Sequence, residues 1–185
     1  MNLKRGSFNS KAQIWVETVI YTLIGLTIMG IILSVVTPKI NQINDRALLS
    51  QTKEAMTQIN EQVQEILSST GQQRDILLTV KKGEYFIDGP GNSISFILKG
   101  TGAPISEPDQ VIKSGEINIL TKTKTSGKYD VYFVLNYSQY NITYSGKDVN
   151  KTFTPAPAGY RLLLINAGSS SITGTKQIDI KPIGA

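Results

Sequence analysis

The sequence lacks the two residue types that most often carry catalytic chemistry, because its 185 residues include no cysteine and no histidine. Thiol nucleophiles, Ser-His-Asp triads, histidine general bases and ordinary zinc sites are therefore excluded. The 14 acidic residues show no pair at a defined spacing, and Gly100-Thr101-Gly102 lacks the rest of any phosphate-binding motif. We therefore expect no enzymatic activity, no cofactor and no metal.

One carboxylate is unusual for its surroundings. Glu17 is the single charged residue in residues 14–36, an apolar run of 23 residues. As a helix this run would be about 35 Å long, which is enough to cross a hydrocarbon core about 30 Å thick. It is too apolar for an ordinary core helix. A secretory signal peptide has a shorter apolar run and small residues at a cleavage site, whereas Pro38 and Lys39 follow here. We therefore predict a retained transmembrane helix over residues 14–36.

The distribution of charge orients this predicted helix. Lys4, Arg5 and Lys11 lie in residues 1–12 with no acid, and without them the formal net charge falls from +5 to +2. The positive-inside rule then keeps the N-terminus in the cytoplasm and exports the rest of the chain. A residual charge of +2 spread over a whole domain argues against nucleic acid as a partner.

Apolar residues at spacings of three, four and seven predict that the helix continues far beyond the membrane segment. We expect one helix over residues 13–70, with a kink at Pro38 and with Gly71 as its left-handed C-terminal residue. Its second half is amphipathic. The expected apolar stripe consists of Ile40, Ile43, Ala47, Leu48, Ala55, Ile59, Val63, Ile66 and Leu67.

Residues 71–185 change to short alternating runs that are rich in β-branched and aromatic residues. These 115 residues are enough for one core. The expected fold class is α+β, with the long N-terminal helix followed by an antiparallel β-sandwich-like head that packs on the helical stripe. We expect a loop at 152–159. The expected strands are 76–82, 84–88, 93–99, 116–122, 128–137, 140–144, 160–166 and 172–181.

Three N-glycosylation sequons lie close together, at Asn136-Tyr-Ser, Asn141-Ile-Thr and Asn150-Lys-Thr. Single sequons arise by chance in a chain rich in Asn, Ser and Thr. Their clustering, together with the predicted export of this region, indicates that at least one carries a glycan. Asn136 and Asn141 fall on expected strands, which favours Asn150.

The junction before the apolar run resembles the class III signal peptide of type IV pilins in its archaeal form. Lys11 and Ala12 precede Gln13, and Glu17 is the fifth residue counted from Gln13. In that family a membrane aspartic peptidase cuts before the apolar helix, so the resemblance places the cut between Ala12 and Gln13. Bacterial pilins commonly have Gly before the cut, Phe after it and paired cysteines in the head. These differences favour an archaeal source.

The resemblance implies a type IV pilin-like fold and a structural role. The precursor would lie in the cytoplasmic membrane, be processed by the prepilin peptidase, and be polymerised by an assembly ATPase and platform protein. The product would be a homopolymeric filament on the cell surface that serves adhesion. The new amino group of Gln13 would pair with Glu17 of a neighbouring subunit. Small residues such as Gly25 and Gly30 would let neighbouring helices approach closely. In the alternative, Glu17 lies at the level of the lipid headgroups and Trp15 anchors the helix at the interface.

Other functions remain open. One is a membrane-anchored extracellular binding or sensor module that never polymerises, with Glu17 simply at the level of the lipid headgroups. Another is a minor subunit that primes or caps a filament or a secretion apparatus. Archaellins share the signal type, but they usually lack this carboxylate. An adhesive pilin is therefore favoured over a motility filament.

Overall fold

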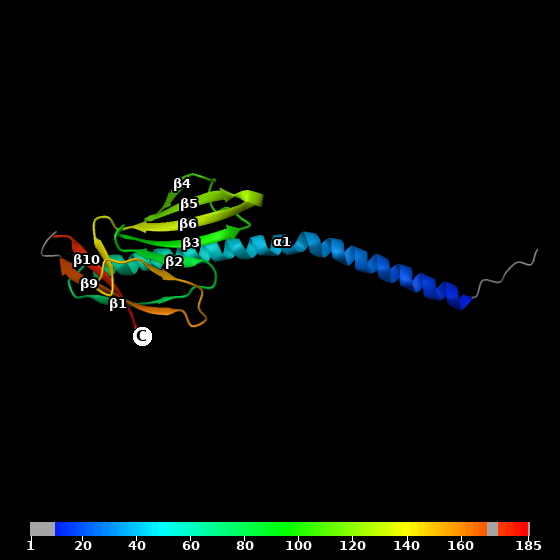
Figure 1. Ribbon diagram of the computed structural model, residues 1–185, viewed down its shortest axis with the longest axis horizontal. Helices are drawn as coiled ribbons and strands as arrows, with labels where there is room; N and C mark the ends of the chain where they lie inside the picture. Colours follow the sequence, from blue (N-terminus) through cyan, green and yellow to red (C-terminus); the bar gives the residue numbers. More distant parts are fainter. Residues whose placement is uncertain (1–9, 170–173, 185) are drawn as a thin grey trace, which may run out of the picture. The chain divides into compact units, whose positions relative to one another are not determined.

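The computed structural model describes residues 10–169 and 174–184 of the chain (Figure 1). The predicted signal residues Lys4 and Arg5 lie outside this part. The chain divides into two compact units, residues 1–43 and 44–185. One helix, α1 (Ser10–Ile66), passes through the boundary between them and contains Pro38. The prediction of an α+β fold with one long N-terminal helix is therefore confirmed.

The first unit contains helical residues and no strand among those described. Its large apolar side chains are exposed throughout residues 14–36, from 37% at Val19 to 70% at Trp15. From Ile14 onward, α1 is long and apolar enough to cross a membrane.

The second unit combines residues 44–66 of α1 with two sheets (Figure 1). One sheet has the strand order β1-β9-β10-β7, and the other has the order β4-β5-β6-β3-β2-β8. A short 3-10 turn, η1 (Thr125–Gly127), connects β5 and β6. The strands are β1 (Gln73–Leu78), β2 (Glu84–Asp88), β3 (Ser93–Thr101), β4 (Val111–Ser114), β5 (Ile117–Lys124), β6 (Lys128–Asn136), β7 (Asn141–Tyr144), β8 (Lys151–Phe153), β9 (Tyr160–Ser169) and β10 (Lys176–Pro182).

The sheets differ from the expected purely antiparallel arrangement at one pair. β7 and β10 are parallel, whereas the other recorded pairs are antiparallel. β9 and β10 are consecutive antiparallel neighbours, so their connection sets the direction of β10. β7 reaches the same sheet through a longer connection, which leaves its direction free.

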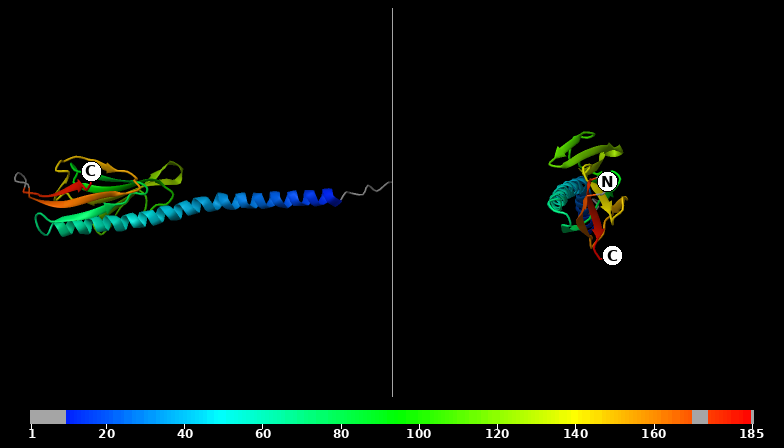
Figure 2. Two further views of the ribbon diagram at one scale, coloured as in Figure 1. Left: turned by 90° about the horizontal axis from the view of Figure 1, so that it is seen from below. Right: turned by 90° about the vertical axis from the view of Figure 1, so that its left-hand side faces the viewer.

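One core joins the two sheets to the second part of α1 (Figure 2). The buried helical residues follow a strict alternation of four and three. The C-terminal part of the expected stripe is confirmed, since Ile59, Val63 and Ile66 are buried, but its beginning is not. Ile40 and Ile43 were expected to pack but are 50% and 65% exposed. Leu49 and Met56, absent from the expected stripe, are fully buried. The observed buried stripe is Asp45, Leu49, Thr52, Met56, Ile59, Val63 and Ile66.

The helix ends at Ile66, before the expected residue 70, and side chains of the four-stranded sheet bind carbonyl oxygens at this end and just beyond it. Asn166 of β9 donates from Nδ2 to the carbonyl oxygens of Ile66 and Ser69, at 3.0 Å each. Lys176 donates to the carbonyl oxygen of Leu67 at 3.3 Å. Gly71 does adopt the expected left-handed conformation, with φ of 82°. The positive φ of Gly71 was therefore predicted correctly, but Gly71 lies beyond the helix end and is not the C-terminal residue of the helix, as had been expected. The cap from Asn166 was not predicted.

Two short strands were not expected. β4 is four residues long, and β8 occupies part of the region predicted to be a loop. Both lie at the edges of the six-stranded sheet and pair with one neighbour only. β1 begins three residues before the expected strand. The first residues of the expected strand 172–181 lie outside the described part of the chain.

Candidate functional site

The threonine and serine hydroxyl groups of residues 14–36 are all hydrogen-bonded to their own helix. Thr18 donates to the carbonyl oxygen of Ile14 at 2.9 Å, and Thr22 to that of Thr18 at 2.8 Å. Thr27 and Ser34 bond in the same way, at 2.7 Å each. A hydroxyl satisfied inside its helix needs no water, so it can face lipid or another apolar helix at little cost. The surface of this segment is therefore more apolar than its composition indicates.

Glu17 lies on this exposed segment, and no ion pair to it is recorded among the described residues. Trp15, half a turn before it, is exposed. The predicted cleavage residues Ala12 and Gln13 lie within α1, close to its beginning at Ser10. The structure thus places the junction and the carboxylate on one continuous helix.

The two glycines singled out from the sequence have open surroundings. A methyl group built on Gly25 or Gly30 would meet no atom within 4 Å, apart from its own helix and chain neighbours. Neither glycine is therefore required by packing within the described chain.

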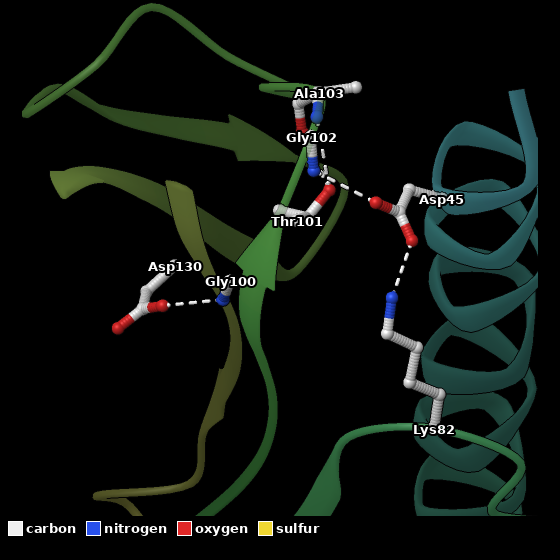
Figure 3. Close-up of polar contacts among 7 residues, drawn as sticks. All are labelled: Asp45, Lys82, Gly100, Thr101, Gly102, Ala103 and Asp130. Atoms are coloured by element: carbon white, nitrogen blue, oxygen red, sulfur yellow. Dashed lines mark hydrogen bonds and ion pairs between the residues drawn. The ribbon is translucent and has the colours of Figure 1, made fainter. Parts of the chain in front are cut away.

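A polar cluster in the second unit was not predicted (Figure 3). Asp45 of α1 is 7% exposed, and its carboxylate accepts hydrogen bonds from Lys82 Nζ at 2.6 Å and from the backbone N–H of Gly102 at 2.8 Å. Burial works to raise the pKa of Asp45, but the hydrogen bonds from Lys82 and Gly102 outweigh it and hold the pKa below its usual value. The carboxylate thus joins the helix to the β1–β2 connection and to the turn after β3.

A second buried carboxylate binds the end of β3, next to this turn and from its other side (Figure 3). The carboxylate of Asp130, on β6, accepts a hydrogen bond from the backbone N–H of Gly100 at 2.8 Å. It also forms an ion pair with Lys124 Nζ at 3.0 Å. Burial opposes ionisation here too, yet these hydrogen bonds lower the pKa of Asp130. Segment 100–103 therefore lies between two ionised carboxylates. Both have their partners within the head, which indicates a structural cluster rather than a binding site.

The three sequons lie in different environments. Asn136 ends β6 and is exposed, Asn141 begins β7 and is half-buried, and Asn150 is exposed just before β8. The structure brings the first two sequons together through Asn92, the last residue of the β2–β3 turn. The backbone carbonyl of Asn92 accepts the N–H of Tyr137 at 2.8 Å. Its side-chain oxygen accepts the N–H of Ile142, also at 2.8 Å.

No group of three or more acidic residues that could hold a metal occurs in the described part of the chain. The chain matches none of the known protein families, curated proteins or solved structures with which it was compared. Its function must therefore be inferred from its own residues.

Sequence reasoning missed Asp45, Asn92 and Asn166. Asp45 is absent from the expected apolar stripe, although it lies four residues before Leu49 on the observed stripe. That spacing was the available signal. Asn92 and Asn166 gave none, because their partners are distant in sequence and appear only when the strands are paired.

Proposed function

We propose that the protein is a structural subunit of a type IV pilus-like filament on an archaeal cell surface. The observation that carries the proposal is the exposed apolar surface of residues 14–36, whose threonine and serine hydroxyls are satisfied internally. Such a surface requires lipid or like helices around it. The same helix continues into a packed β-rich head.

Residues 14–36 suit both the membrane before assembly and the helix bundle of a filament after it. Before assembly, residues 14–36 lie in the cytoplasmic membrane with the N-terminus inside. During assembly they exchange lipid for the helices of other subunits, so no large apolar area enters water. The open surfaces at Gly25 and Gly30 allow close helix packing in the polymer. The heads coat the filament and make the adhesive contacts, and the role is structural rather than enzymatic.

Glu17 is the residue through which subunits align. Cleavage between Ala12 and Gln13 creates a positive amino group on the same helix. A carboxylate in an apolar environment costs about 2.5–3.5 kcal/mol at the bilayer centre and less near the interface. Pairing with the amino group of a neighbouring subunit removes that cost, and the pairing forms only in the polymer.

The first experiment determines the N-terminus and the state of assembly. We expect mass spectrometry of the filament fraction to give a chain that begins at Gln13, and electron microscopy of sheared cells to show filaments. Ala12→Phe should block processing, and Ala12→Gly should preserve it. A mature chain that begins at Met1, or a correctly folded protein that is purely monomeric in the membrane, would indicate the anchored binding module instead.

The second experiment tests Glu17. Glu17→Ala should reduce filament yield at least tenfold while the head keeps its melting temperature, because no contact within the described chain depends on Glu17. Glu17→Asp keeps the charge and should retain part of the yield. Filaments of normal number and length from Glu17→Ala would assign Glu17 to the lipid headgroup region and refute its role in alignment.

A further inference from the structure

The three sequons differ in whether a transferase can read them on the folded head. A sequon is read at its asparagine amide and at the hydroxyl of its third residue. An enzyme therefore has to reach both groups, and it must also surround the middle residue that lies between them.

The sequon at Asn141 is closed by folding. The hydroxyl of Thr143 is buried, since the residue is 3% exposed, and it donates to Asp179 at 2.8 Å. The same hydroxyl accepts a hydrogen bond from Gln177 at 3.1 Å. The middle residue, Ile142, is fully buried and belongs to the core. Reading this sequon would require β7 to separate from β10.

The sequon at Asn136 is inaccessible for a different reason, because its middle residue is buried and bonded to other segments. The side-chain oxygen of Asn136 accepts the N–H of Ser138 at 2.9 Å, which folds the sequon back on itself. The middle residue, Tyr137, is 2% exposed, and its hydroxyl donates to Asn60 of α1 at 3.1 Å. Its backbone is bound to Asn92 as well. Two ends of this sequon are exposed, but its centre is fixed to the helix and to a turn.

The sequon at Asn150 is open along its whole length. Asn150, Lys151 and Thr152 are all exposed. The last two belong to β8, a three-residue strand at the edge of the six-stranded sheet. An edge strand has one side without a neighbour, so an enzyme can approach it without breaking the core.

We propose that Asn150 is the single N-glycosylated residue of the folded head, and that Asn136 and Asn141 stay unmodified. The donor is an oligosaccharide joined through phosphate to a lipid carrier. The Nδ2 atom of Asn150 forms a bond to the anomeric carbon of the sugar, and the bond from that carbon to the phosphate oxygen breaks. The lipid phosphate leaves, and the amide proton passes to a base of the transferase. The inference rests on the proposed export of the head.

The test uses the full chain expressed in cells that carry an N-oligosaccharyltransferase, together with an acceptor protein known to be modified there. Glycopeptide mass spectrometry should find the glycan at Asn150 alone. Asn150→Gln should remove all of the glycan mass, whereas Asn136→Gln and Asn141→Gln should leave it unchanged. Thr152→Val should abolish the modification, and the matched Thr152→Ser variant should retain it because the hydroxyl remains.

Glycan at Asn136 or Asn141 would overturn the inference, because it would show transfer before the head folds. A bare Asn150 beside a modified acceptor protein would overturn it as well. Circular dichroism of each variant checks that the head has folded. Filament formation is scored separately by electron microscopy, so a missing glycan on normal filaments refutes this inference alone. Glycan on a chain that never polymerises refutes the filament.

Discussion

The two parts of α1 differ in where their apolar side chains lie and in what covers them. Residues 14–36 carry apolar side chains around the whole helix, and all of them are exposed in the described chain. Residues 45–66 confine their buried positions to one stripe at spacings of four and three, and the two sheets cover that stripe. The first part therefore needs a partner outside the chain, whereas the second has one inside.

Polar groups follow the same division. In the first part, hydroxyls such as that of Thr22 bond to their own helix and leave the surface apolar. In the second part, Asp45 and Asn60 bond to groups on distant segments, namely Lys82 and Tyr137. The polar groups of the first part thus bond within their own helix, whereas those of the second part bond to distant segments of the head and add specificity to that packing.

The largest expected difference comes from placing one carboxylate in each part. Val63→Asp buries an unpaired charge in the core and should destabilise the head by at least about 3–5 kcal/mol, a large share of the stability of a domain. Ile28→Asp should leave the melting temperature of the head unchanged and should prevent membrane retention or assembly. Thermal unfolding of the full chain in detergent and membrane fractionation measure the two effects.

Gln58→Asp, on the exposed face of α1 near Val63, is the matched control and should change neither property. Equal loss of head stability in Ile28→Asp and Val63→Asp would show that the two parts of the helix are not independent. The contrast between an exposed first part and a packed second part of α1 would then be wrong.

Local patterns were enough to predict the helix, and global pairings were not. The apolar run and its length predicted the exposed segment, because membrane helices are recognised by composition alone. The amphipathic stripe was misplaced at its beginning, since Ile40 and Ile43 look like core residues in sequence but are exposed. Leu49 and Met56 continue the four-three spacing that begins at Asp45. A search for apolar residues alone does not include Asp45 and so misses this register.

The head shows the same limit. Most of its long strands were predicted from alternation, but β8 has three residues and too short a pattern to detect. The parallel pairing of β7 with β10 depends on how the chain returns between sheets. Asn166 caps a helix that ends one hundred residues earlier in the sequence. No local signal contains that contact, because it arises only from the packed arrangement.

An intermediate effect is expected from removing this cap. Asn166→Ala leaves the buried carbonyl oxygen of Ile66 without its donor and also removes the bond to Ser69, which should cost about 1–3 kcal/mol. For a domain of this size that corresponds to a fall of roughly 2–4 °C in melting temperature per kcal/mol. Asn150→Ala, at an exposed position, should change the stability by less than about 0.5 kcal/mol. If Asn166→Ala and Asn150→Ala had equal melting temperatures, packing alone would hold the helix end in place.

The smallest expected effect is a dependence of head stability on pH. Asp45 and Asp130 have pKa values below the ordinary 3.8 in the folded head. The unfolded chain therefore binds more protons in acid, and the stability that these groups provide is present above pH 3.8 and is lost as the pH falls through their folded pKa values.

Urea unfolding midpoints should therefore vary little from pH 7 to pH 5 and should decline below about pH 4. Asp45→Asn and Asp130→Asn should each flatten this decline, by at most about 1.4 kcal/mol per pH unit for one proton. The matched substitution Glu54→Gln, on the exposed face of α1, should leave the slope unchanged. If Asp45→Asn kept the full slope, the acid sensitivity would belong to other carboxylates, and the bond from α1 to segment 100–103 would not depend on charge.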